Sequence, residues 1–113
     1  MKGEILLSND DKYIGDFKND QKDGEGIMYY KNKDRYEGHY HKGLREGHGI
    51  YYYKDGSKFE GEFFEGVKEG KGILILSNCN KYEGDFKKNA KEGYGIFYNK
   101  TKDIDMKDNL KKI

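Results

Sequence analysis

The sequence lacks several features that define common classes of protein. Its single cysteine, Cys79, excludes a disulfide framework within the chain and fits a reducing compartment. No apolar run approaches the length of a membrane span, and the segment from Met1 to Leu7 is too short for the core of a signal peptide. We therefore expect a cytoplasmic protein, and a peripheral position at a membrane or the cytoskeleton is compatible with the same observations.

An excess of either charge is also missing. The chain carries 22 Lys and Arg against 21 Asp and Glu, and the two signs are interleaved along its length. A surface that neutralises nucleic-acid phosphates needs a basic stripe, so we expect no nucleic-acid partner.

Apolar residues are scarce for a compact globule. They make up 34% of the 113 residues, against 38% charged residues, and such a balance is typical of disorder. The 11 Tyr and 6 Phe argue the other way. Few aliphatic and many aromatic side chains favour one thin domain that stacks rings on a sheet and has no thick core.

A repeat with a period of 23 residues organises the chain. Repeat architectures are recognised by such a period before any local feature. The segment from Gly3 to Tyr13 aligns with Gly72 to Tyr82, so the chain opens in the middle of a repeat, with either a cap strand or a fragment boundary. We place a half repeat at 1–12, full repeats at 13–35, 36–58, 59–81 and 82–104, and a C-terminal tail at 105–113.

Each repeat contains two predicted strands. The first, typified by Tyr82 to Phe86, alternates rings with acids, so both rings and the central glycine share one face of the strand. The second, typified by Gly49 to Tyr53, is apolar on both faces. Residues that tolerate positive φ mark a tight turn inside each repeat: Asp20, Gly43, Gly66 and Asn89. Such short connections predict an all-β antiparallel meander of about nine strands.

The tail departs from this pattern. Thr101 is a candidate cap for a short helix with Met106, Leu110 and Ile113 on one side, which would cover the last edge strand. The alternative is a frayed, charged end.

Thirteen of the 16 glycines fall in three equivalent columns. The pair Gly47 and Gly49 does not indicate a nucleotide loop, because that motif requires a parallel sheet and a following helix. A glycine between two rings on one face leaves a trough in which a ring can lie flat, so we expect Gly38→Val to destabilise the sheet.

The repeat from Tyr36 to Lys58, YEGHYHKGLREGHGIYYYKDGSK, resembles the MORN (membrane occupation and recognition nexus) repeat. The resemblance extends from Gly3 to about Lys100. It implies β-hairpins stacked into an elongated, twisted single-layer sheet. It also implies a scaffold that often dimerises, of a kind found beside lipid kinases, in junction proteins and in protist cytoskeletons. Three positions depart from the pattern: Ile14, Asp20 and Cys79.

Candidate metal and catalytic residues occupy variable or repeated columns. The histidines His39, His41 and His48 align with mixed surface residues in the other repeats, so we expect no metal site. The acids recur in every repeat, whereas a catalytic pair needs one special environment. These acids are Asp16, Glu37, Glu60, Glu62, Glu83 and Asp85. The sequence holds no nucleophile set, phosphate loop or cofactor signature, so we expect no enzyme activity, cofactor or small-molecule substrate.

The lysines near the turns inside the repeats bear on membrane binding. Acids occupy the same turns and offset most of their charge, which favours a solvated rim over a lipid-binding edge. The lysines are Lys18, Lys22, Lys42, Lys68, Lys71, Lys87, Lys88 and Lys91.

The sequence favours a non-catalytic scaffold that self-associates or docks a protein partner along an aromatic groove. Exposed tyrosine-rich patches are typical of interaction surfaces. The predicted groove residues are Tyr13, Phe17, Tyr29, Tyr36, Tyr40, Tyr52, Phe59, Phe63, Tyr82, Phe86 and Tyr98. Two alternatives remain: a peripheral module for phosphoinositides or anionic lipids, and the targeting segment of a larger enzyme such as a lipid kinase.

Overall fold

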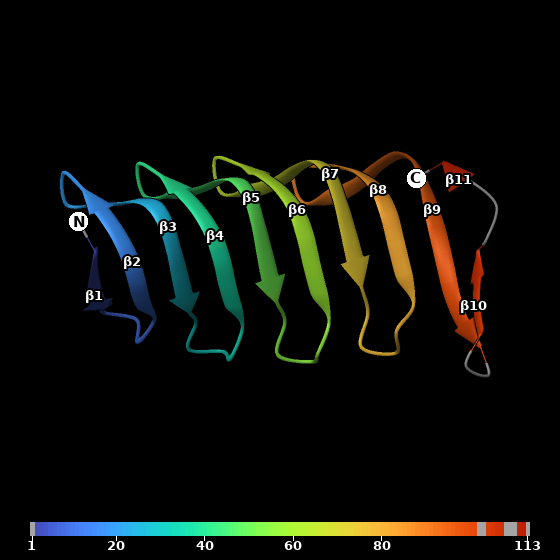
Figure 1. The fold of residues 1–113 in the computed structure, drawn as a ribbon, viewed down its shortest axis with the longest axis horizontal. Helices are drawn as coiled ribbons and strands as arrows, with labels where there is room; N and C mark the ends of the chain where they lie inside the picture. The colour runs from blue at the N-terminus through green and yellow to red at the C-terminus, as the bar shows by residue number, and fades with distance from the viewer. Residues whose placement is uncertain (1, 102–103, 108–110, 113) are drawn as a thin grey trace.

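The computed structural model describes residues 2–101, 104–107 and 111–112. Every regular element in these ranges is a β-strand, and all the strands belong to one open antiparallel sheet (Figure 1). Each strand from β1 to β10 pairs with its neighbours in sequence. The prediction of an all-β meander built from stacked hairpins is confirmed.

The two strands of each repeat have different lengths. The first strands have seven residues each and are β2 (Lys12–Lys18), β4 (Arg35–His41), β6 (Lys58–Phe64) and β8 (Lys81–Lys87). The second strands are β3 (Gln21–Tyr29), β5 (Leu44–Tyr52), β7 (Val67–Ile75) and β9 (Ala90–Thr101). The half repeat supplies β1 (Lys2–Leu6), a second strand that forms one edge of the sheet.

Of the two alternatives for the tail, the short helix is not found among the residues that the structure describes there. Two short strands, β10 (Ile104–Lys107) and β11 (Lys111–Lys112), both pair with β9. Met106 lies in β10, whereas Leu110 and Ile113 lie outside the described residues. The open edge of β9 offers unpaired backbone groups, and β10 and β11 satisfy part of them as antiparallel pairs.

Tight turns join the two strands of each repeat, as expected. Both central residues of each turn have positive φ, which is the geometry of a type I′ hairpin turn. These residues are Asn19 and Asp20, Lys42 and Gly43, Glu65 and Gly66, and Lys88 and Asn89. This geometry matches the right-handed twist of the strands that it connects.

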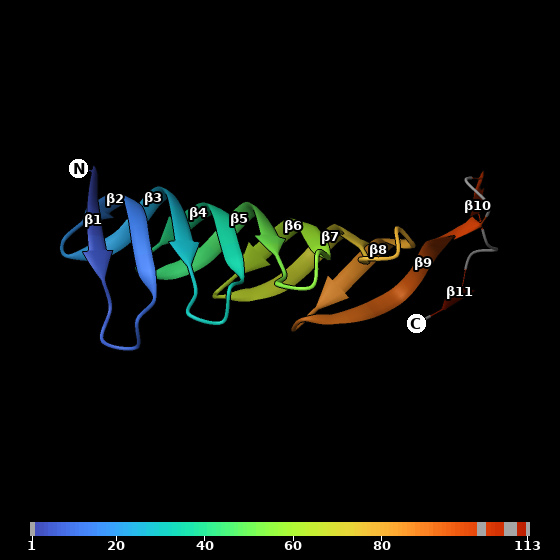
Figure 2. The ribbon, with the colours of Figure 1, turned by 90° about the horizontal axis from the view of Figure 1, so that it is seen from below.

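A β-bulge bends every hairpin. In the first repeat, Gly15 pairs with Gly26 and Phe17 pairs with Lys22, so the second strand carries extra residues around Gly24, which has a φ of 102°. The same shift recurs in the other repeats, and bulges of this kind curve a sheet. The molecule measures 47 × 26 × 20 Å, and its smallest dimension is too large for one flat layer of strands. Figure 2 shows the strands curving along the length of the array.

Eight aromatic rings form one continuous row along the array, which we call the ring ladder. Seven of the rings are buried, and neighbouring rings meet edge to face, as in Tyr13–Tyr40 at 5.2 Å and Tyr36–Phe63 at 5.1 Å between centroids. The ladder consists of Phe17, Tyr13, Tyr40, Tyr36, Phe63, Phe59, Phe86 and Tyr82.

The face of the sheet that carries the ring ladder, which we call the inner face, is the concave one. Lys68 and Tyr53 lie near opposite ends of their strands, yet the Lys68 ammonium donates a hydrogen bond to the Tyr53 hydroxyl. Side chains can meet in this way only if the sheet folds toward them. The bend explains how a single layer of strands buries Tyr13, Tyr36 and Phe59 completely.

Candidate binding face on the outside of the sheet

The structure divides the eleven predicted groove residues between two faces. Tyr13, Tyr36, Tyr40, Phe59, Phe63, Tyr82 and Phe86 are buried in the ring ladder. Phe17 packs against them, half-buried, at the start of the array. The remaining three, Tyr29, Tyr52 and Tyr98, lie on the opposite, outer face and are the ones that a partner can reach.

The outer tyrosines belong to a row in which apolar and basic residues alternate. Tyr29 is 41% exposed. The Arg35 guanidinium lies 4.1 Å from the ring centre of Tyr52, and the Lys81 ammonium lies 4.4 Å from that of Tyr98. Such cation–π contacts cover the rings in part and keep the row in contact with water. From β2 to β9 the row, in order of strand pairing, is Lys12, Tyr29, Arg35, Tyr52, Lys58, Ile75, Lys81 and Tyr98.

Two residues further along each strand, isoleucines alternate with glutamates. Ile27, Ile50 and Ile73 each pair with a glutamate of the next first strand, and Ile96 pairs with Glu83 of the preceding one. The side chains are half-buried, except for the more exposed Glu83. The row consists of Ile14, Ile27, Glu37, Ile50, Glu60, Ile73, Glu83 and Ile96.

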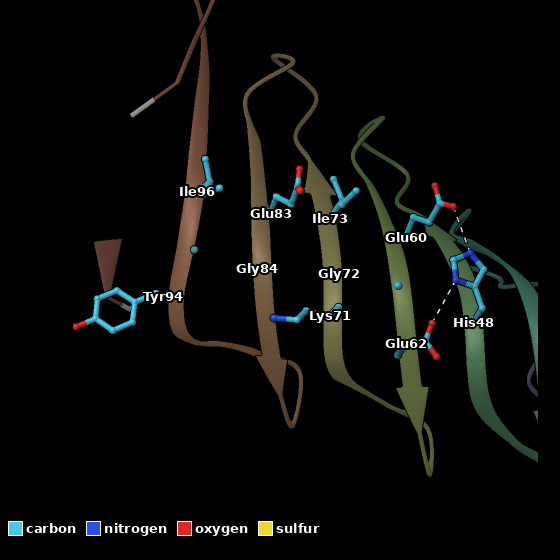
Figure 3. Close-up of a pocket in the computed structure, with 12 residues that line it drawn as sticks. His48, Glu60, Glu62, Lys71, Gly72, Ile73, Glu83, Gly84, Tyr94 and Ile96 are labelled. Atoms are coloured by element: carbon cyan, nitrogen blue, oxygen red, sulfur yellow. Dashed lines mark hydrogen bonds and ion pairs between the residues drawn. The ribbon is translucent and has the colours of Figure 1, made fainter. Parts of the chain in front are cut away.

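Bare glycine backbone lies beside this row. A Cβ added to Gly72 would collide with the Phe59 ring, so the missing side chains belong to the inner face, and the other side of the same backbone lines the outer face. The result is a trough that crosses the strands. It contains a hollow of about 610 Å³ over β5 to β9 and another of about 410 Å³ over β1 to β4. Figure 3 shows the first hollow, with Gly72 and Gly84 in its floor.

The row of isoleucines and glutamates forms one wall of the trough. The second wall is polar, and its side chains form ion pairs and hydrogen bonds with one another. His48 lies between two carboxylates, with Nε2 at 3.2 Å from Glu60 and Nδ1 at 3.3 Å from Glu62 (Figure 3). Lys71 pairs with Asp85 at 2.8 Å, and this carboxylate raises the pKa of the Lys71 ammonium. The pairs on this wall are exposed, so each contributes little to stability and remains available to a partner.

The same wall continues toward the N-terminus. His39 pairs with Glu25 at 2.6 Å. Asp16 accepts hydrogen bonds from the Lys2 ammonium and from the backbone N–H of Glu25, and these bonds lower the pKa of the Asp16 carboxyl.

Each histidine contacts a carboxylate on an adjacent strand. His41, the third, lies 3.6 Å from Asp23. Among the residues that the structure describes, no group of three or more histidine, cysteine or acidic side chains is arranged to hold a metal ion.

The polar second wall of the trough could not be predicted from the residue pattern of each strand taken alone. That pattern identified the isoleucines and the outer tyrosines, but it left the acids and histidines as isolated surface positions. The signal that could have found the wall is the strand register: Glu25 pairs with His39 and His48 with Glu62, so residues from different repeats become neighbours.

An open sheet assembled from equivalent hairpins, each contacting only the next, defines a β-repeat protein with an extended binding face. The family model for the MORN repeat matches the chain four times, at residues 13–35, 36–58, 59–78 and 82–103. The chain belongs to the MORN repeat family, which is generally a non-catalytic repeat module. A search of the curated proteins returned no match to the chain. No helix in the described part of the chain is long and apolar enough to cross a membrane.

Proposed function

We propose that this MORN array is a non-catalytic scaffold that binds an extended protein segment in the outer trough. The observation that supports this proposal is the pair of hollows of about 610 and 410 Å³ along one glycine-floored path. Isoleucine side chains along this path offer apolar contact, and the paired polar wall offers hydrogen bonds. Interfaces combine these two features in an apolar centre and a polar rim.

The charge of the trough indicates the chemistry of the partner. Its walls carry seven carboxylates against two lysines, Lys2 and Lys71. A segment in which basic and apolar residues alternate would place its cations against the acids and its apolar side chains against the isoleucines. The seven carboxylates belong to Asp16, Glu25, Glu37, Glu60, Glu62, Glu83 and Asp85.

A synthetic peptide in which Arg and Val alternate over nine residues tests the proposal. We expect the double variant Glu60→Gln, Glu83→Gln to bind this peptide about tenfold more weakly than the parent, because roughly 1.4 kcal/mol corresponds to a factor of ten. Glu65→Gln is the matched control, since Glu65 is an exposed acid in a turn between β6 and β7. Equal binding by the parent and the double variant in fluorescence anisotropy would refute the proposal.

A second copy of the chain is the other candidate occupant, and light scattering across a concentration series separates the two cases. A mass that doubles with concentration, and stays single in the Glu60→Gln, Glu83→Gln variant, would identify self-association through the trough. A constant single mass leaves the trough to a different protein. A further experiment measures binding of the protein to vesicles that contain phosphatidylserine. Binding to these vesicles without binding to the peptide would favour the lipid alternative.

A further inference from the structure

A row of four cations, which we call the cation row, lies on the inner face. It consists of Lys22, Arg45, Lys68 and Lys91, one residue from the second strand of each repeat. Each cation lies over the rings: Lys22 is 5.3 Å from the ring centre of Tyr40, and Arg45 is 5.3 Å from that of Phe63. The cation row therefore faces the concave side, away from the outer trough.

The four cations form no ion pairs within the part of the chain that the structure describes, although Lys2, Lys12 and Lys71 do. The carboxylate closest in effect to Lys22 is that of Asp11. All four side chains are half-buried. Burial lowers the pKa of the Lys22 ammonium, and the nearby charge of Arg45 lowers it further. Two like charges held together over apolar rings form an environment that favours an anion.

A buried hydroxyl faces the same place. Tyr40 is only 4% exposed, and its Oη forms no hydrogen bond of regular geometry with a described residue, although it interacts with the neighbouring Tyr30 hydroxyl. Buried polar atoms are satisfied in the great majority of cases, so an unpaired one indicates a missing ligand or water. Tyr40 lines a hollow of about 290 Å³ together with Lys22 and Arg45.

The hollow is not purely cationic. Leu7, Met28 and Leu44 supply apolar walls, and Asp11 lies in its lining. The Asp11 carboxylate accepts a hydrogen bond from the backbone N–H of Lys31, so it belongs to the loops that stack one repeat on the next. Arg45 also lines a second hollow of about 210 Å³, with Lys68 on its far side. The two hollows thus meet at Arg45.

We propose that these inner hollows bind carboxylates of an extended acidic segment of a partner protein. One carboxylate lies between Lys22 and Arg45 and accepts a hydrogen bond from the Tyr40 hydroxyl, and the next lies between Arg45 and Lys68. This site is independent of the outer trough, which has the opposite charge. A chain with both sites can hold two different segments on its two faces.

The spacing of the cation row defines the pattern of the segment. Equivalent residues of successive repeats are two strands apart, which is about 9.6 Å for a strand separation of roughly 4.8 Å. Three residues of an extended chain span about 10 Å. The partner segment therefore carries an acid at every third position, with apolar residues between the acids to contact Leu7, Met28 and Leu44.

Peptide binding to the full chain tests the inner site. The probe is a ten-residue peptide with Asp at every third position and Leu or Ala between, compared with the same peptide carrying Asn in place of Asp. We expect the Asp peptide to bind at least tenfold more tightly than the Asn peptide, and its affinity to fall about tenfold in Lys22→Gln. Lys18→Gln, which changes an exposed lysine at the end of β2, should leave the affinity unchanged.

Tyr40→Phe separates binding from folding. It removes a buried hydroxyl that forms no hydrogen bond of regular geometry with a described residue and interacts with the Tyr30 hydroxyl, so the midpoint of thermal unfolding should change little while the affinity for the Asp peptide falls. Equal binding of the Asp and Asn peptides, or an affinity that Lys22→Gln and Tyr40→Phe leave unchanged, would overturn the proposal. So would binding to phosphatidylserine vesicles that depends on Lys22 when the Asp peptide does not bind. None of these results bears on the outer trough, because its test uses a basic peptide and variants of Glu60 and Glu83.

Discussion

At the scale of single residues, the fold depends on rings that lie flat on glycine. The Tyr36 ring crosses two glycines of neighbouring strands, Gly38 and Gly49, and its hydroxyl donates a hydrogen bond to the backbone carbonyl of His39. Phe59 occupies the equivalent place in the third repeat without a hydroxyl. Ring packing on bare backbone is thus common to the repeats, whereas the hydroxyl bond is an addition that one repeat omits.

Gly38→Val is expected to destabilise the protein by about 3 kcal/mol or more, a large part of the stability of a small domain. A Cβ at this position would lie 2.6 Å from the Gly49 Cα and 2.6 Å from the Tyr36 hydroxyl, so backbone as well as ring must move. Urea unfolding measures the loss. Gly43→Asn is the control, because nothing lies within 4 Å of its added Cβ and Asn tolerates its φ of 86°. A Gly38→Val variant as stable as the control would show that the ring is not seated as described.

At the scale of the element, the loops between repeats share one design. Each begins with a backbone hydrogen bond between residues three apart, such as Cys79 N–H to the Leu76 carbonyl at 2.8 Å. The residue that donates this bond has positive φ, and it is Gly56 in the second repeat and Cys79 in the third, with φ of 95° and 72°. The loops also stack on one another, since the Asp34 carboxylate accepts a bond from the backbone N–H of Lys54 in the next loop.

Two substitutions in the loop after β7 should have opposite effects. A residue with a side chain in the left-handed region is strained by roughly 1–2 kcal/mol, and Cys79→Gly relieves this strain. The larger conformational entropy of glycine in the unfolded chain offsets part of the stabilisation. We expect a net stabilisation of up to about 1 kcal/mol. Asn78→Gly instead removes the acceptor of the Asn80 N–H, at 2.9 Å, and should destabilise by about 1 kcal/mol. Thermal unfolding of both variants decides the matter, and a shift of the same sign in both would contradict the reasoning.

At the scale of the whole molecule, repetition spreads the core along 47 Å in place of gathering it at a centre. The tyrosines of the ring ladder are therefore many and similarly placed. Burial, together with the charges of Asp16 and Asp23, raises the pKa of the Tyr13 hydroxyl to about 12. Burial also raises the pKa of Tyr36 and Tyr40 well above the usual value near 10.

Alkaline pH should therefore unfold the array. Since these tyrosines hold their protons more tightly in the folded state, their contribution is fully present below about pH 10 and decreases as the pH rises through the folded pKa values. We expect stability to fall from about pH 10 to 12 and beyond, with tyrosinate absorbance rising together with loss of the β-sheet circular dichroism signal. Tyr13→Phe, which introduces the ring that the third repeat carries at Phe59, should flatten this pH dependence. Tyrosine ionisation that is complete near pH 10 in a still folded protein would disprove the burial argument.

The local pattern was enough to predict the strands, the tight turns and the ring-and-glycine face. Alternation of Tyr82, Gly84 and Phe86 assigns one face of a strand, and Asp20 or Asn89 marks a turn, because both depend on neighbours in sequence. The same reasoning placed all eleven aromatic residues in one groove. Alternation along each second strand instead places Tyr29, Tyr52 and Tyr98 on the outer face, and the bend at the bulges buries the ladder on the inner one.

The sequence by itself determined the repeat, its period, its hairpins and its membership of a family, because these features recur at a fixed spacing and need only local chemistry. The tertiary structure alone decided which face is concave, which acids form one wall, and that Lys22 and Arg45 share a hollow with Tyr40. It also placed the described residues of the tail in strands paired to β9, where the sequence had left a short helix or a frayed end open. These outcomes depend on strand register and on the summed curvature of several bulges. Residues far apart along the chain become neighbours only when the whole sheet has formed.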